Sequence, residues 1–240
     1  MSSPALRQRD ALSGGQATSA ASAARASRAV PRWAVASAAL APVLATVGWL
    51  VADALQPASY SPVRETVSVL AGQAGTDRWV MTGALFLVGG CYLLTAAGLA
   101  GIRRPARILL VVAGVAVTGI AVSPEPASGP SARHLAWTVL GAVAIAIWPA
   151  FVACRGSPRS PVLSVPGAAV VTVIFVALLG WFLAEARGGD MVGLAERLTT
   201  SIEASWPFVV ALALRRSTQC DSVHTPGRKE TQPRPAFTPQ

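Results

Sequence analysis

Long runs of apolar residues alternate with short polar segments over most of this 240-residue chain. A helix rises about 1.5 Å per residue, so roughly 20 apolar residues are needed to cross a hydrocarbon core about 30 Å thick. Six runs meet or approach that length, at about residues 34–55, 79–100, 107–123, 134–154, 163–184 and 194–214. The pattern therefore predicts an all-α, polytopic membrane protein built as a six-helix transmembrane bundle.

The two ends of the chain lack this pattern. Residues 1–32 are rich in Ala and Ser, and residues 216–240 are rich in Pro, Thr and Arg, so neither segment can bury enough apolar surface to fold. We expect disordered tails on either side of a membrane domain at 33–215. The first apolar run is longer than the signal-peptide core of about 7–15 residues, so we expect it to be retained. The small-residue pattern at 52–54 leaves cleavage open as an alternative, with five helices remaining.

A polar segment at residues 60–81 separates the first two runs. Ser61 can cap a short helix with Pro62 at its first position, and Gly72 suits its end. Three apolar residues share one face of that helix: Val63, Val67 and Leu70. The spacing predicts an amphipathic helix lying flat on the outer membrane surface. Thr76 is expected to cap the second membrane helix.

Composition and charge add sidedness to this picture. Only 13% of the residues are charged, against roughly 25% in soluble domains. With six helices and an inner N-terminus, the inner segments hold 15 of the 20 basic residues and the outer loops hold five. Because positive loops stay in the cytoplasm, both termini are predicted to lie there. The basic residues are spread over short loops and tails, so the net charge of +9 does not indicate a nucleic-acid partner.

Two further features bear on the setting of the chain. Lys229 is the only lysine, a bias typical of GC-rich bacterial genomes, and we expect the bacterial cytoplasmic membrane. Five tryptophans fall near the ends of apolar runs, where interface anchors belong: Trp33, Trp49, Trp79, Trp137 and Trp181.

Glu203 is the most informative single residue. It follows Glu196 by seven positions, which places it roughly 10 Å deeper along the last helix. A charged group at mid-membrane costs about 2.5–3.5 kcal/mol on insertion scales. Glu196, Thr199, Thr200 and Glu203 lie within about 100° on one helical face, so this polar stripe should face the bundle interior.

Several polar residues are candidate neighbours of Glu203 on the outer side. One interpretation is a water-accessible pocket that opens outward; the other is a structural network that fixes the 60–81 segment to the last helix, or a Glu203 that stays protonated. The candidate pocket residues are Arg64, Glu65, Asp77, Arg78, His134, Glu196, Arg197, Thr200 and Glu203.

Motifs of known catalytic chemistry are absent from the sequence: there is no phosphate-binding glycine loop, HExxH or GxSxG. The cysteines, Cys91, Cys154 and Cys220, show no CxxC spacing, so we expect neither a disulfide nor a zinc site. No cofactor and no metal are expected. His134 has the chemistry of a general base, although an interface histidine with satisfied hydrogen bonds is the preferred interpretation.

Several stretches resemble the bacterial domain-of-unknown-function family 998. They are YSPVRETVSVLAG followed by DRWVM in the 60–81 segment, His134 at the start of the fourth run, and GLAERLTTSIEASWPFVV in the last run. The resemblance covers about residues 36–215. It implies a polytopic, all-helical membrane protein and carries no established activity or catalytic residue.

These observations favour a non-enzymatic membrane protein that binds a lipid or small solute in an outward-facing polar pocket. Two alternatives stay open: an enzyme acting on lipid head groups at the outer leaflet, with His134 and Glu203 as acid and base, and a proton-coupled transporter using Glu203. Membrane lipids are the expected partners. A homo-oligomer is an open alternative, since a six-helix transporter would need a dimer.

Overall fold

A computed structural model of the protein describes residues 30–129, 131–153 and 160–223. All regular structure in these residues is helical. The elements are α2 (Arg32–Ala54), α3 (Val67–Ala71), α4 (Trp79–Gly98), α5 (Arg104–Val122), α6 (Ala132–Val152), a 3₁₀ turn η1 (Pro161–Leu163), α7 (Val165–Glu185) and α8 (Val192–Val223).

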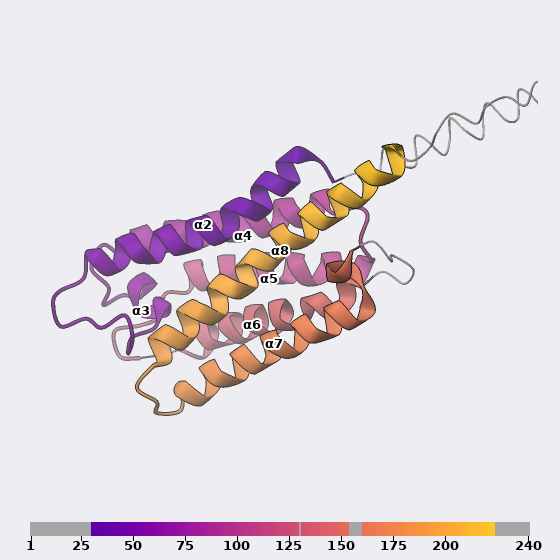
Figure 1. Cartoon of the computed structure of the whole chain (residues 1–240). Coiled ribbons are helices and arrows are strands. Elements are labelled where there is room, and N and C mark those ends of the chain that lie inside the picture. The colour runs from indigo at the N-terminus through magenta and orange to yellow at the C-terminus, as the bar shows by residue number, and fades with distance from the viewer. Residues whose placement is uncertain (1–29, 130, 154–159, 224–240) are drawn as a thin grey trace, which may run out of the picture.

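The six long helices form a closed ring. Helix α2 packs on α4, α4 on α5, α5 on α6 and α6 on α7, and α8 closes the ring between α7 and α2. The start of α2 and the end of α8 lie at one end of the bundle, whereas α3 and the α7–α8 connection lie at the other, which we call the α3 end (Figure 1). The ring leaves an interior onto which all six helices face.

The outer surface of this ring is apolar. On α7 only Ala168 and Phe175 are buried, and large apolar side chains such as Val173 (68% exposed) and Ile108 (60% exposed) point outward. A soluble protein rarely exposes apolar patches of such extent. Among the described helices, α2, α4, α5, α6 and α7 are each long and apolar enough to cross a membrane. The chain is a multi-pass membrane protein, and five of the six expected spans are confirmed.

The last helix departs from the expected bounds. Helix α8 continues to Val223, nine residues beyond the expected end at 214. The expected C-terminal tail at 216–240 therefore begins in helix. The expected tail regions 1–29 and 224–240, together with Cys154, lie outside the described residues.

The amphipathic helix expected to begin at Ser61 is wrong in extent. The observed helix α3 holds only five residues, after Thr66. Backbone carbonyls that would bond within a longer helix are taken by α8: Arg197 donates to those of Pro62 and Glu65, and the Leu194 amide donates to that of Val63. Leu70 and Ala71 are fully buried. Helix α3 thus packs against α2, α4 and α8 at the end of the bundle.

The expected cap of α4 is also wrong. The residue that precedes the helix is Arg78, with no side-chain capping bond, and Asp77 adopts a positive φ of 48°. The backbone of Thr76 pairs instead with the side-chain amide of Gln56, which donates to its carbonyl and accepts from its N–H. This amide ties the end of α2 to the start of α4.

Two glycines of α4 allow close contact with neighbouring helices, as small residues commonly do in membrane bundles. A Cβ at Gly89 would lie 2.8 Å from the Gly114 carbonyl oxygen of α5, and one at Gly98 would meet Ala34 and Trp33 of α2. Gly83 and Gly90 face open space, with no atom within 4 Å of a Cβ. Small residues at 89 and 98 therefore serve helix packing, whereas those at 83 and 90 do not.

This difference gives a matched pair of substitutions. Gly89→Ala forces α4 and α5 apart, and we expect it to lower the free energy of unfolding by about 1–2 kcal/mol. Gly90→Ala adds the same methyl group into open space and is expected to leave stability unchanged. Thermal unfolding of the detergent-purified variants measures both; equal midpoints would contradict the close α4–α5 contact.

Candidate functional site

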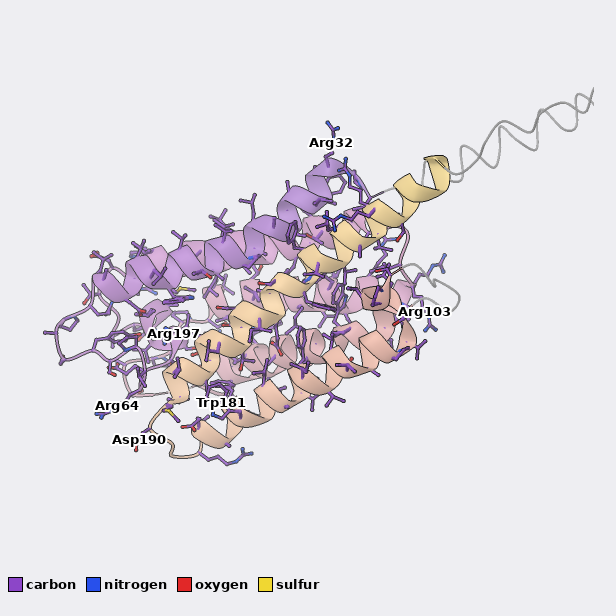
Figure 2. The ribbon with its side chains drawn as sticks, in the orientation of Figure 1. Arg32, Arg64, Arg103, Trp181, Asp190 and Arg197 are labelled. Atoms are coloured by element: carbon purple, nitrogen blue, oxygen red, sulfur yellow. The ribbon has the colours of Figure 1, made fainter. Side chains whose placement is uncertain are left out.

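A buried arginine, Arg197 of α8, organises the α3 end of the bundle. It is only 5% exposed, and Figure 2 shows it within the bundle, beside the loop that precedes α3. Its Nη2 donates to Oδ1 of Asp53 at 2.7 Å, which forms a salt bridge between α8 and the last turn of α2. Its Nη1 donates to three backbone carbonyls, those of Pro62 and Glu65 at 2.8 Å and that of Gly193 at 3.1 Å.

Tyr60 completes this group, which we call the Arg197 cluster (Arg197, Asp53 and Tyr60). Its hydroxyl donates to Oδ1 of Asp53 at 2.9 Å and accepts from Nη2 of Arg197 at 2.5 Å. Burial raises the pKa of Tyr60 above its ordinary range, so the phenol keeps its proton and serves as a donor to Asp53. The three side chains come from α2, α8 and the loop between α2 and α3.

Glu196 holds the same loop from the neighbouring position of α8. Its Oε2 accepts the backbone N–H of Val67 at 2.6 Å, at the first residue of α3. A carboxylate at a helix start satisfies an N–H group that has no partner inside the helix. Glu196 and Arg197 therefore fix the 60–67 segment onto α8 from two sides.

A cavity of about 150 Å³ lies in the interior of the ring, and α3 forms part of its lining. Every long helix and α3 contribute to its lining, which is mostly apolar. The polar lining comes from Ser68 of α3, Thr138 of α6, Tyr92 of α4, Trp49 of α2, and Glu196, Thr199, Thr200 and Glu203 of α8.

The buried carboxyl group of Glu203 is a feature of this cavity that helix packing does not explain. The residue is 3% exposed, and its Oε1 is buried with no hydrogen-bond partner in the described part of the chain. A buried polar group without a partner loses its hydration with no compensation, which costs about 1–3 kcal/mol and more if the group is charged. Native proteins keep few such groups, so this carboxyl needs an explanation.

His134 lies beside the cavity but is fully engaged. Its ring is 4% exposed, with Nδ1 at 2.8 Å from the Ser123 carbonyl and Nε2 at 3.0 Å from Oγ of Ser68. A carbonyl only accepts, so Nδ1 carries the proton, and Nε2 accepts from the Ser68 hydroxyl. The histidine thus joins the start of α6 to α3, in the structural role that was preferred for it.

The structure divides the nine candidate pocket residues into three groups. Glu196, Thr200 and Glu203 line the cavity. Glu65, Arg197 and His134 hold the segments around it. Arg64 and Asp77 are exposed, and Arg64 points away from the end of the bundle (Figure 2). Arg78 stacks on the Trp79 ring at 3.9 Å. No arginine or histidine is among the described residues that line the cavity with Glu203.

Several residues of this region were not among the candidates, including Ser68, Thr138 and Thr199, which line the cavity. Asp53 and Tyr60 complete the Arg197 cluster, and Trp49 and Tyr92 line the cavity. Trp49 was expected at the membrane interface; instead its Nε1 is buried without a partner. The sequence offered one signal for each missed residue of the cluster. Asp53 is an acidic residue in the last turn of the first apolar run, and Tyr60 opens the YSPVRETVSVL stretch.

The ring of apolar helices around a small, partly polar interior defines a polytopic membrane protein of the all-helical class. The family model described as "Protein of unknown function (DUF998)" matches residues 39–213. Because that match spans more than half of the chain, the protein belongs to the DUF998 family, as its sequence resemblance implied. No curated protein and no solved structure matches the chain.

Proposed function

We propose that this protein is a six-span, non-enzymatic membrane protein of the bacterial cytoplasmic membrane that binds a lipid or small solute in its interior cavity. The observation that carries the proposal concerns the Glu203 carboxyl. Glu203 lines the cavity, and its Oε1 is buried with no hydrogen-bond partner among the described residues. Ionisable groups inside membrane helices are functional more often than not. A ligand in the cavity would supply the missing partner.

The proposal takes α8 as the sixth span. Glu196, Arg197 and Glu203 interrupt its apolar run, yet all three are at most 8% exposed, so the lipid-facing side of α8 is free of them. Helix α8 lies between α2 and α7 along the length of the bundle (Figure 1). The excess of basic residues in the tails and in the connections at the end opposite α3 supports a cytoplasmic location for both termini.

The geometry favours binding over catalysis by His134. Both ring nitrogens of His134 have partners within the protein. A general base must reach the proton that it removes, at about 2.6–3.2 Å, and His134 would first have to break its bond with Ser68. The acidic side chains left in the cavity are then Glu203 and Glu196, and Glu196 already accepts the Val67 amide.

Native mass spectrometry of the purified protein in mild detergent tests the proposal. We expect a bound mass on the wild-type protein, lost when Ala142→Phe fills the cavity and when Glu203→Gln removes its carboxylate. Ala136→Phe places the same ring on the exposed face of the same helix, and Arg64→Ala changes an exposed charge, so both should keep the mass. A wild-type protein without a bound mass, or retention of the mass by all four variants, would contradict the proposal.

A further inference from the structure

The serine and threonine hydroxyl groups around the cavity are engaged as donors to other protein groups. Each threonine hydroxyl donates to a backbone carbonyl, which leaves its oxygen lone pairs free to accept: Thr138 to His134 at 3.0 Å, Thr199 to Leu178 at 3.2 Å, and Thr200 to Glu196 at 2.7 Å. The Ser68 hydroxyl donates to Nε2 of His134. All four hydroxyls therefore offer acceptors to a ligand.

The carboxyl groups add to this excess of acceptors. Among the residues that the structure describes, Oε1 of Glu203 has no hydrogen-bond partner and Oε2 of Glu196 accepts the Val67 amide. Donors are fewer: the described lining offers the indole N–H of Trp49 and the hydroxyl of Tyr92. Arg197 is not among the lining residues, and its two Nη atoms donate to Asp53, Tyr60 and backbone carbonyls. The cavity thus carries two acidic side chains and, in the described lining, no basic one.

A ligand that complements this lining must bring hydrogen-bond donors and positive charge. An ammonium group offers three donors and no acceptor, and its hydrogen bonds to a carboxylate are of the stronger, charge-assisted kind. No group of three His, Cys, Asp or Glu side chains in the described chain is placed to hold a metal ion, which favours an organic cation.

The remaining walls of the cavity define the part of the ligand to which the ammonium group is attached. They are apolar and include Leu85, Val88, Val117, Ile145 and Phe182. A volume of 150 Å³ matches cavities that take up a molecule of about the size of benzene.

We propose that the cavity is a binding site for a small lipophilic amine, whose ammonium group is held by the Glu203 carboxylate while its apolar body packs among α4, α5, α6 and α7. This inference rests on the proposed binding function and adds the chemical class of the ligand. The four hydroxyl oxygens accept the remaining ammonium protons or lie close to them, and Trp49 offers its N–H to an oxygen that the ligand carries.

Benzylamine and its neutral counterpart, benzyl alcohol, test this assignment on the full-length protein in detergent. Isothermal titration is expected to show benzylamine binding at least tenfold more tightly than benzyl alcohol to the wild type. In Glu203→Gln the preference should fall to about twofold or less, because the amide keeps the shape and loses the charge. Arg64→Ala is the matched control and should keep the full preference.

The outcomes separate this inference from the proposed function. Equal binding of both compounds to the wild type overturns the amine and leaves the cavity as a site for neutral ligands. A preference that survives in Glu203→Gln removes Glu203 from the site and overturns the assignment. Binding of neither compound overturns the amine together with the proposed cavity function.

A second arm identifies the source of the amine. The amine could be a free molecule or the head group of a lipid, and both present the same ammonium. Titration in nanodiscs of phosphatidylethanolamine and of phosphatidylglycerol distinguishes them. Weaker benzylamine binding in the first would support a lipid head group, and equal binding would support a free amine; both results uphold the amine. Loss of the tenfold preference in both nanodiscs would overturn it.

Discussion

Replacing Arg197 with methionine should lower the free energy of unfolding by about 3–5 kcal/mol, the range measured when one partner of a buried ion pair is removed. The substitution leaves the Asp53 carboxylate, 15% exposed, beside Tyr60 without its cation. It also removes the donor to the carbonyls of Pro62, Glu65 and Gly193. Methionine keeps much of the length of the arginine side chain, so the loss reports on hydrogen bonds and charge more than on volume.

Arg64→Met is the matched control, since it makes the same substitution at an exposed position of the loop that Arg197 holds. Surface substitutions of this kind usually stay within about 0.5 kcal/mol. Arg197→Lys should give an intermediate loss, because a lysine ammonium lacks the planar fork with which the guanidinium reaches Asp53 and the carbonyls together. Unfolding in detergent, followed by circular dichroism over a denaturant series, compares the three proteins. A loss for Arg197→Met no larger than that for Arg64→Met would show that the Arg197 cluster contributes little to stability.

The positions of the spans could be read from the sequence because lipid imposes a simple rule on it. A helix in a hydrocarbon core needs about 20 predominantly apolar residues, so the runs of apolar residues mark the helices directly. The structure confirms five of them within a few residues at each end. The rule weakens outside the core, which is why the expected end at 214 did not predict the continuation of α8 to Val223.

The 60–81 segment could not be predicted by the same reasoning. Local spacing favoured a helix from Ser61, but the carbonyls of Pro62, Val63 and Glu65 bond to α8, some 130 residues away. Backbone carbonyls are present at every position, so the residue types do not show which of them accept long-range hydrogen bonds. A long-range contact of this kind overrides local preference without any local signal.

In the candidate site, too, the features that follow from local periodicity could be predicted and those that depend on long-range packing could not. The stripe of Glu196, Thr200 and Glu203 followed from helical periodicity, and all three line the cavity. The partners could not be assigned, because Arg64 and Arg197 look equivalent in the sequence and only the packing of α2 against α8 buries one of them. The cavity itself arises from side-chain volumes on all six long helices, which no periodicity encodes.

Replacing Glu203 with methionine should raise the free energy of unfolding by about 1–3 kcal/mol, the cost of a buried polar group without a partner. The residue is 3% exposed, and its Oε1 has no partner in the described part of the chain. Methionine has a similar length, and its apolar side chain is compatible with the apolar cavity lining, which includes Leu85, Val88 and Ile145. Denaturant unfolding of the ligand-free protein measures the change, with Glu65→Met as the comparison.

The sign of this change separates the two interpretations of Glu203. Glu65 accepts the Ser61 amide through its Oε1, so Glu65→Met removes a formed hydrogen bond and should lower stability by about 1 kcal/mol. A glutamate that is retained for structure behaves like Glu65, and its replacement destabilises the protein. A glutamate that is retained for a ligand lowers the stability of the empty protein, and its replacement stabilises it. Destabilisation by Glu203→Met would therefore remove the observation on which the proposed binding function rests, whereas stabilisation combined with loss of the bound mass would establish Glu203 as a functional residue.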